Sequence, residues 1–456
     1  MTKKSFFLAG GDFLWAGMAY GLAVFIHWGL PLSSRKLFHN EMASLCVFAA
    51  VLLVTTYFSE LYNLDRIYRF QEIIFRLCAS LVLAFFALSA LYHLFPTVST
   101  GNRLLVLALA GFGILQLMWH KAYQRILLLP GFAERVLIFG TGPMAMEMRE
   151  VLKEKSRNAI FAGYIGPEGD VTLVAEEDIV EVKDSLVETA QRMGARKIIV
   201  ALRQRRGILP VRELLLCKFA GIDVIESSTF YEELTGKLML ERINASWFVF
   251  STNFRVTTFA RFCRFTKRIF DIIFAIVGLC FAAPLLPVIA LCVKLSSPGP
   301  VFFRQTRVGM GEKIFSLLKF RTMFEDAERI TGAVWAQQND PRITPLGRFL
   351  RKTRLDELPQ LFNVLKGDMS FVGPRPERPE FVNMLNEKIN FYSKRHTLKP
   401  GITGWAQVRY PYGSSLEDSL EKLKYDLYYI KNYSFHLDFF IILETIKVVL
   451  FGRGGR

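Results

Sequence analysis

Two adjacent carboxylates, Asp356 and Glu357, stand inside a strongly basic stretch of the chain. Residues 351–377 read RKTRLDELPQLFNVLKGDMSFVGPRPE, so basic residues precede the acids and a Gly-Pro-Arg-Pro turn comes after them. Consecutive side chains on a helix diverge by about 100°, so both carboxylates cannot approach one atom in the same way. An acidic pair at a helix start is ordinarily a surface feature that complements the helix dipole. Here the basic flanks and Pro359 favour a divided role, with one acid as nucleophile and the other holding a divalent cation.

Basic residues recur before and after the acidic pair, and their side chains suit phosphate chemistry. Guanidinium groups match phosphate oxygens in a bidentate way, so a subset that converged on the two acids would fit a pyrophosphate substrate. The other basic residues would form a solvated face or contact lipid phosphates. The basic residues in question are Arg304, Arg307, Lys319, Arg321, Arg342, Arg348, Arg351, Lys352, Arg354, Arg375 and Arg409.

The composition indicates two or three domains, part of them in lipid. The chain has 456 residues, of which 52% are hydrophobic, and its mean hydropathy is +0.27. The formal net charge of +16 fits an anionic membrane surface or a phosphorylated substrate, and the apolar spans argue against a nucleic-acid partner. The six cysteines form no CxxC pair and no HExxH motif occurs. We therefore expect neither a disulfide framework nor a structural transition metal.

The first quarter of the chain predicts an α-helical membrane bundle of four spans, assigned to residues 1–125. Each apolar stretch is near the length needed to cross a bilayer. Placing the N-terminus in the cytoplasm leaves most lysines and arginines of the connecting segments on that side, as the positive-inside rule favours. An even number of crossings then returns the chain to the cytoplasm. The four stretches are residues 8–30, 42–58, 77–95 and 104–120.

Residues 126–255 predict a Rossmann-like α/β domain. An apolar strand at Val136–Phe139 runs into Gly140-Thr141-Gly142 and then a helix-like pattern, with Ala145 at the third glycine position of the dinucleotide fingerprint. However, no acidic residue closes the second strand at the usual distance. Two interpretations stay open, a nucleotide-free α/β domain and a helix N-terminus that holds an anion.

Residues 256–456 open with an uncharged apolar run over 272–293 that is long enough to be a fifth crossing. A fifth crossing would place the rest of the chain outside the cell. Pro284 and Pro287 lie in the middle of the run and oppose a straight helix. We therefore expect a re-entrant helix over 269–294, with a proline-kinked crossing as the alternative.

The last apolar segment, residues 426–452, is interrupted by Asp438 and Glu444. Such a helix lies in the membrane interface more readily than across it. The expected architecture is therefore an α-helical membrane bundle, an α/β Rossmann-like domain and a mostly α-helical, re-entrant-membrane domain on the cytoplasmic face.

Six ordered motifs resemble one family. They are KRIFD, the proline-broken apolar run, SPGPVFFRQTRVG, KFRTM, TRLDELPQLFNVLKGDMSFVGPRPE and KPGITGWAQV, and together they cover about residues 262–452. They resemble the bacterial sugar transferases called monotopic phosphoglycosyl transferases, or polyprenyl-phosphate hexose-1-phosphate transferases. The membrane helices and α/β domain before them resemble the large members of that family, in the exopolysaccharide branch.

The resemblance implies a reaction. Asp356 would attack the β-phosphate of a UDP-hexose, UDP-glucose first and UDP-galactose second, and release UMP. Undecaprenyl phosphate would then accept the phosphosugar as the first step of exopolysaccharide repeat-unit synthesis, while Glu357 would hold Mg²⁺. The residues implied in phosphate contacts, or in stabilising the broken helix, are Lys319, Arg321, Arg351, Arg375 and Arg409. At Arg409 the chain departs from the family pattern, because RYPYGSS comes after the GWAQV motif where many relatives have Asn-Gly-Arg.

The resemblance also implies a bacterial inner (plasma) membrane location, contacts with membrane lipids and no nucleic-acid partner, and we expect a homodimer. Two other interpretations compete with it. A membrane-anchored nucleotide-sugar dehydratase or epimerase would need a dinucleotide and a Tyr-x-x-x-Lys pair, and none follows the Gly-Thr-Gly loop within the α/β domain. A non-enzymatic scaffold would leave the two acids inert.

Overall fold

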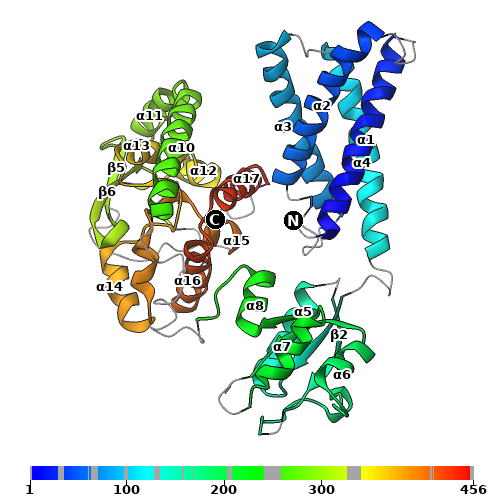
Figure 1. Ribbon diagram of the computed structural model, residues 1–456. Coiled ribbons are helices and arrows are strands. Elements are labelled where there is room, and N and C mark those ends of the chain that lie inside the picture. Colours follow the sequence, from blue (N-terminus) through cyan, green and yellow to red (C-terminus); the bar gives the residue numbers. More distant parts are fainter. Residues whose placement is uncertain are drawn as a thin grey trace. The chain divides into compact units, whose positions relative to one another are not determined.

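The chain divides into two compact units, Met1–Thr235 and Gly236–Arg456, which are coloured along the sequence in Figure 1. The computed structural model describes residues 3–28, 35–59, 61–62, 70–96, 101–127, 134–156, 159–167, 169–202, 208–240, 258–325, 340–410, 413 and 415–451. The predicted boundary between residues 255 and 256 lies outside these ranges. The second unit includes residues ahead of that boundary, because Leu238 is buried in its core and its amide donates to the Lys424 carbonyl at 3.1 Å.

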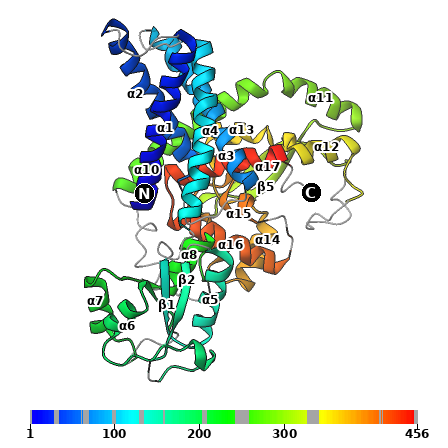
Figure 2. The same cartoon turned by 90° about the vertical axis from the view of Figure 1, so that its right-hand side faces the viewer.

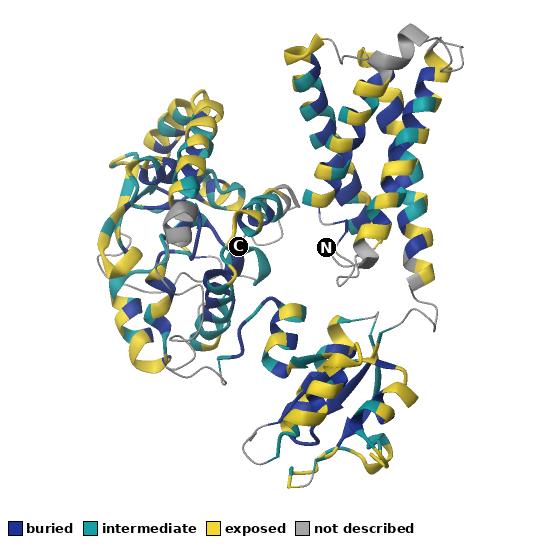
Figure 3. Cartoon of the chain, in the orientation of Figure 1, coloured by how far each residue is buried: buried dark blue, intermediate teal, exposed yellow. Residues whose placement is uncertain are grey.

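Four helices form the first part of unit 1: α1 (Lys3–Trp28), α2 (Arg35–Phe58), α3 (Phe70–Leu94) and α4 (Asn102–Leu127). Three segments are long and apolar enough to cross a membrane, Phe6–His27, Phe70–Leu94 and Asn102–Tyr123, and Met42–Phe58 is a shorter apolar helix. Buried residues from all four helices form one hydrophobic cluster. Buried and exposed residues alternate along each helix (Figure 3), and many of the exposed residues are apolar. The helical, apolar character predicted for this part is confirmed, but among the described residues it has three candidate spans and one shorter apolar helix where four spans were predicted.

A fully buried carboxylate ties this bundle together. Asp12 accepts hydrogen bonds from the Tyr62 hydroxyl and from Gln116 Nε2, both at 2.8 Å, and lies 3.0 Å from His120 Nε2. The Gln116 amide also donates to Thr56 Oγ1 at 3.0 Å. Polar groups inside an apolar bundle are costly unless they are paired, and this network joins α1, α2, the turn after α2, and α4. The network therefore fixes how α1, α2 and α4 pack.

The rest of unit 1 is an α/β domain with a parallel sheet, as predicted. The sheet has the order β2-β1-β3-β4 and all of its neighbouring strands are parallel. Helices α5 and α8 pack together, as do α6 and α7, and Figure 2 shows α5 on one side of the strands with α6 and α7 on the other. The elements are β1 (Glu134–Phe139), α5 (Pro143–Lys155), β2 (Ala159–Ile165), η2 (Glu176–Asp178), α6 (Leu186–Arg192), β3 (Ala195–Val200), α7 (Val211–Phe219), β4 (Asp223–Glu226) and α8 (Ser227–Thr235).

The Gly140-Thr141-Gly142 loop of this domain is already occupied by the chain itself. The Thr141 amide donates to Asp170 Oδ2 at 2.8 Å, and the Leu173 amide donates to the Thr141 carbonyl at 2.9 Å. Gly140 has φ +127°, which disfavours any residue with a side chain. The Asp170 carboxylate therefore takes one of the backbone amides that an anion could use at this helix N-terminus.

Unit 2 packs helices around two small sheets. β5 (Phe302–Val308) and β6 (Ile314–Phe320) form an antiparallel pair, and β7 (Ser370–Val372) and β8 (Gly401–Thr403) form a parallel pair. The helical elements are α10 (Thr258–Ala282), α11 (Leu285–Ser296), η5 (Met310–Glu312), α12 (Pro345–Thr353), η6 (Leu355–Glu357), α13 (Gln360–Lys366), α14 (Pro379–Lys388), η7 (Tyr392–Thr397), α15 (Trp405–Arg409), α16 (Leu416–Lys431) and α17 (Phe435–Phe451).

The apolar run at the start of unit 2 is broken where the prolines predicted. Helix α10 ends at Ala282, Pro284 is the N-cap of α11, and the two helices bend by 63°. Pro287 lies in the first turn of α11, where a missing backbone N–H removes no intrahelical bond. Large apolar side chains are exposed on both helices, namely Phe265, Ile269, Phe270, Ile273, Ile276, Val277, Phe281, Leu285, Val288, Leu291 and Leu295.

The C-terminal apolar segment forms two helices, so the expectation of one helix over 426–452 was wrong. Helix α16 ends at Lys431 and α17 begins at Phe435. Asp438, which was expected to interrupt the apolar face, is buried and accepts from Lys267 Nζ at 2.5 Å and from the Tyr429 hydroxyl at 2.6 Å. The acid therefore joins α17 to α10 and α16.

Candidate active site

The acidic pair lies in a tight turn between two helices. Helix α12 ends at Thr353, and Arg354 takes the left-handed conformation with φ +58°. Asp356 and Glu357 come next in the 3₁₀ turn η6, and Pro359 caps α13. The single left-handed residue reverses the chain just before the acids. The turn gives two neighbouring carboxylates different surroundings.

Asp356 is buried with one carboxylate oxygen unpaired. Its side chain is 7% exposed, and no described residue hydrogen-bonds to Oδ1. Burial and the neighbouring Glu357 raise the pKa of Asp356 to about 6, against the opposing effect of Lys319, Arg351 and Arg375. At neutral pH the carboxylate is mostly ionised, and a buried, unpaired anionic oxygen is unusual in a protein. Such an oxygen is available to react with an electrophile.

Glu357 is paired where Asp356 is not. Its Oε1 accepts from Arg375 Nη2 at 2.9 Å and from Arg354 Nη1 at 3.3 Å. Although burial opposes ionisation, these two arginines hold the pKa of Glu357 below its usual value. The two neighbouring carboxylates therefore differ, because Glu357 is paired with arginines and Asp356 Oδ1 has no hydrogen-bond partner in the described structure.

Lys319 on β6 acts electrostatically on the same carboxylates. Burial, together with the nearby charges of Arg307 and Arg351, lowers the pKa of Lys319 to about 8, while Asp356 opposes that shift. The ammonium also lies 5.2 Å from the ring centroid of Phe303 on β5. An anion that binds beside Lys319 would favour the protonated form of this side chain, because it offsets the repulsion from the neighbouring cations.

Arg351 is oriented by a buried threonine. Its Nε donates to Thr322 Oγ1 at 2.9 Å, and Thr322 lies just beyond the end of β6. Helix α12 can approach that segment because Gly347 has no side chain, and a Cβ there would overlap the Thr322 carbonyl. The fixed guanidinium lowers the pKa of both Asp356 and Lys319. The structure thus brings Lys319, Arg351 and Arg375 together around the acids.

Two of the basic residues expected to contact phosphate lie in other surroundings. Arg321 is buried and donates to the Ser297 carbonyl at 2.6 Å and to Ser297 Oγ at 3.0 Å, at the C-terminal end of α11. Arg409 stacks its guanidinium 4.3 Å from the Trp405 ring centroid. Neither makes a hydrogen bond or ion pair with Asp356 or Glu357 within the described ranges. Arg321 instead holds the end of the helix that Pro284 begins.

Sequence reasoning missed the residues that hold these elements together. The Asn363 side chain of α13 pairs with β6, since its Nδ2 donates to the Ser316 carbonyl at 2.7 Å and its Oδ1 accepts from the Leu318 amide at 3.0 Å. Arg268 on α10 donates to the Val364 and Leu365 carbonyls at the end of α13. An asparagine inside a short apolar helix was the available signal, because asparagine is unfavourable there unless its side chain has a partner.

Glu357 and Asp356 are the side chains that would hold a magnesium ion bound together with a substrate. No group of three or more His, Cys, Asp or Glu side chains gathers in the described part of the chain. Mg²⁺ commonly takes only one or two carboxylates and completes its shell with phosphate oxygens and water. Glu357, ionised and beside the free Asp356, offers such a ligand set. A bound ion there would neutralise charge on the phosphates.

Comparison with known proteins gives a family. The model of the bacterial sugar transferase family matches residues 262–452. A UDP-N-acetylgalactosamine-undecaprenyl-phosphate N-acetylgalactosaminephosphotransferase of Aeromonas hydrophila is 42% identical over 54% of this chain and 56% of its own length. UDP-glucose:undecaprenyl-phosphate glucose-1-phosphate transferases of Escherichia coli and Caulobacter vibrioides are 48% and 43% identical, each over 40% of this chain and over 40% and 69% of their own lengths.

The similar regions cover different shares of these relatives. The chain spans from about a third to just over half of the length of the first curated relatives it matches, but more than two thirds of the Caulobacter vibrioides protein. The match includes the acidic turn and the elements that surround it. The chain therefore belongs to the bacterial sugar transferase family.

Proposed function

We propose that this protein transfers a sugar 1-phosphate from a UDP-sugar to undecaprenyl phosphate through a covalent intermediate on Asp356. The observation that carries the proposal is the buried, unpaired Oδ1 of Asp356 beside three cations. The names of the relatives support the same class of donor and acceptor. A carboxylate nucleophile suits the task, because an acyl phosphate retains enough transfer potential to pass the group on.

The proposed reaction has two displacements at phosphorus. A carboxylate oxygen of Asp356 attacks the β-phosphorus of the UDP-sugar, the bond from that phosphorus to the bridging oxygen breaks, and UMP leaves with the electron pair. A phosphate oxygen of undecaprenyl phosphate then attacks the same phosphorus and frees the carboxylate. The products are UMP and a polyprenyl diphosphate sugar, and no proton transfer to or from Asp356 is required.

The cations around the turn would stabilise charge that develops on the phosphate oxygens. Arg375 and Arg351 are held by hydrogen bonds to Glu357 and Thr322, so they need little rearrangement when substrate binds. Lys319 would add a third charge. Mg²⁺ bound through Glu357 would neutralise phosphate charge. The buried Arg321 would act at a distance, by holding the end of α11.

The architecture proposed around this site is a membrane enzyme of the bacterial inner membrane with its catalytic unit on the cytoplasmic face. The bent pair α10–α11 would enter and leave the membrane on one face, and its exposed apolar side chains support that arrangement. The first four helices would cross the membrane fully. Such a site could take a water-soluble donor and a lipid acceptor, as the first step of exopolysaccharide repeat-unit synthesis.

The relatives are named for different sugars. The relatives act by name on glucose and on N-acetylgalactosamine donors, so these two join UDP-galactose as candidates. The test uses the full-length protein in detergent with undecaprenyl phosphate and Mg²⁺, and measures UMP release from a panel of UDP-sugars. We expect rapid release with one of the panel. Absence of UMP release with every UDP-sugar would contradict the proposed function.

A further inference from the structure

The turn that carries Arg375 is held through its backbone carbonyl oxygens. Residues 374–377 read Pro-Arg-Pro-Glu, and each of the four carbonyls accepts a hydrogen bond of 2.9 Å. Backbone amides supply two of these bonds and guanidinium groups supply the other two. The donors, in chain order of the acceptors, are the Gly401 amide, Arg395 Nη2, Arg307 Nη1 and the Val308 amide.

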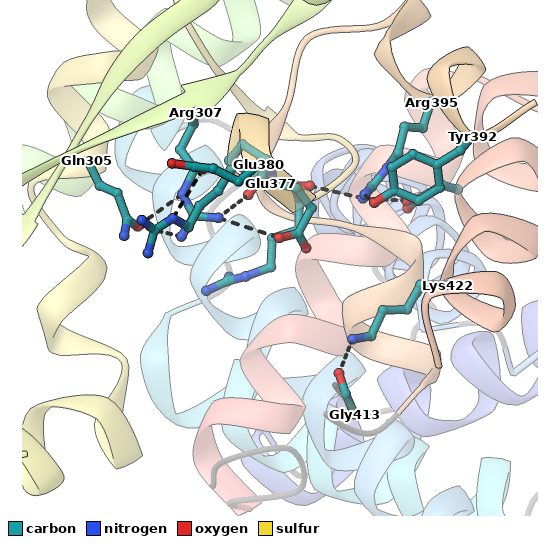
Figure 4. Close-up of polar contacts among 12 residues, drawn as sticks. Gln305, Arg307, Glu377, Glu380, Tyr392, Arg395, Gly413 and Lys422 are labelled. Atoms are coloured by element: carbon teal, nitrogen blue, oxygen red, sulfur yellow. Dashed lines mark hydrogen bonds and ion pairs between the residues drawn. The ribbon is translucent and has the colours of Figure 1, made fainter. Parts of the chain in front are cut away.

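Arg307 and Arg395 reach the turn from different elements, and Figure 4 shows them on either side of Glu377. Arg307 on β5 is half-buried and is held by Gln305 Oε1 at 2.6 Å. Arg395 on η7 is only 5% exposed. The Arg395 side chain is too deeply buried to meet a substrate directly, so its effect must pass through the groups that it contacts.

Arg395 is fixed by an acid from another helix. Asp426 on α16 lies 2.8 Å from Arg395 Nη2, and Tyr392 accepts at its hydroxyl from Nη1 at 2.5 Å. The nitrogen that contacts Asp426 also donates to the Arg375 carbonyl. Both charges are buried, and burial raises the pKa of Asp426 to about 6 although Arg395 opposes this shift. The carboxylate is therefore ionised at neutral pH and sets the position of the donor.

We propose that Arg395 and Asp426 form a positioning pair that holds Arg375 in place to bind Glu357. The inference rests on the proposed function, in which Arg375 acts beside the reacting carboxylate. The contacts run from Asp426 to Arg395, from Arg395 to the Arg375 carbonyl, and from the Arg375 side chain to Glu357. A planar guanidinium can meet all of its partners at once and an ammonium cannot, so lysine should replace Arg395 poorly.

The first test compares two acids on the same helix in the full-length protein. Asp426→Asn removes the carboxylate that orients Arg395. Glu421→Gln is the matched control, since Glu421 pairs with Lys237 and Lys424 and makes no hydrogen bond or ion pair with the 374–377 turn in the described part of the chain. We expect kcat for UMP release to fall 10- to 100-fold in Asp426→Asn at pH 7.5, with KM for the UDP-sugar changed less than threefold, and no more than a twofold change in Glu421→Gln. Equal rates in the two variants would overturn the proposal.

A double-mutant cycle separates positioning from a general loss of structure. If Asp426 acts through Arg375, adding Asp426→Asn to an Arg375→Leu protein should reduce kcat by less than twofold further. A structural defect elsewhere would multiply the two losses, and that result would also overturn the proposal. Arg395→Lys should behave like Asp426→Asn.

Hydrogen exchange gives a readout that does not depend on activity. The Gly401 and Val308 amides donate to carbonyls of the held turn, and we expect these two amides to exchange at least tenfold faster in Asp426→Asn than in Glu421→Gln. Unchanged exchange would contradict the positioning role. If the wild-type protein released no UMP from any UDP-sugar, the proposed function would fail, while this exchange experiment would still decide whether the pair holds the turn.

Discussion

Two loops of this molecule invite a phosphate-binding interpretation, and they differ in how their polar groups are satisfied. The Gly140-Thr141-Gly142 loop has the motif of a nucleotide site, but the Thr141 amide is bound by the chain's own Asp170. The Asp356-Glu357 turn matches no short phosphate-binding motif of that kind, yet it leaves Asp356 Oδ1 buried without a hydrogen-bond partner in the described structure. The polar groups of the first loop are satisfied by its own domain, whereas those of the second are satisfied only in part.

The difference shows which observation is informative about function. A glycine-rich turn before a helix can serve to pack a sheet, and Gly140 needs its positive φ here whether or not a nucleotide binds. A buried carboxylate oxygen without a partner costs stability, because ionised groups lose much of their hydration when they are buried. Such a cost indicates a site that acts on something other than the protein itself.

The largest effect that could sharpen this comparison is the loss of the free carboxylate. Asp356→Asn keeps the size of the side chain but removes the nucleophile, so UMP release should fall by about 10⁴-fold or more. Asp170→Asn, the matching change in the other loop, should alter the rate less than twofold. Steady-state assays with the preferred UDP-sugar measure both. A residual rate within tenfold of wild type in Asp356→Asn would remove the basis of the comparison.

The next effect concerns the paired carboxylate. Arg375→Leu removes the 2.9 Å contact with Glu357 and one cation near the substrate phosphates, and kcat should fall by about 10²–10³-fold, as for other fixed charges that stabilise a transition state. Arg348→Leu is the control, because Arg348 is exposed on α12 one turn before Arg351. We expect that control to stay within threefold of wild type. Similar losses in both variants would indicate a general charge effect.

A smaller effect is expected from a buried histidine of the catalytic unit. Burial and the neighbouring Arg395 lower the pKa of His396 to about 4, so the unfolded chain binds a proton there more readily than the folded one. The free energy of unfolding is therefore unaffected by this histidine above about pH 6.5 and decreases as the pH falls toward 4. The decrease is about 2–3 kcal/mol at pH 4.5. Thermal unfolding between pH 7.5 and 4.5 should therefore be less pH-dependent in His396→Gln. His436→Gln, at an exposed position, should keep the wild-type slope, and an unchanged slope in His396→Gln would contradict the assignment.

The smallest effect tests the Gly140-Thr141-Gly142 loop. Asp170→Ala leaves the Thr141 amide without its 2.8 Å acceptor, and the α/β domain should lose about 1–2 kcal/mol of stability. Hydrogen exchange of residues 139–145 should increase while UMP release stays within twofold of wild type. If the wild-type protein bound a dinucleotide, or if Asp170→Ala lost much of its activity, the loop would do more than support the sheet.

The sequence predicted the elements better than the contacts between them. The parallel sheet, the apolar helices and the break at Pro284 could be predicted from local patterns, since periodicity, span length and proline chemistry act over a few residues. The different surroundings of Asp356 and Glu357 depended partly on Lys319 of β6 and on Arg375, which are not neighbours of the acidic pair in the chain. Arg321 looked like a phosphate ligand because its type fits, but only the fold reveals its bonds to Ser297. The contact between Asp170 and Thr141 could not be predicted for the same reason, because the two residues are 29 positions apart in the chain.

The most direct measurement of the central claim is the intact mass of the full-length protein after incubation with its UDP-sugar and Mg²⁺ but no undecaprenyl phosphate. We predict that the wild-type chain gains the mass of one sugar phosphate, that the added mass maps to the peptide containing Asp356, and that undecaprenyl phosphate then removes it. Asp356→Asn should gain nothing. An adduct of the same mass on the Asp356→Asn chain, or rapid UMP release without any covalent adduct on the wild-type chain, would contradict the proposed covalent mechanism.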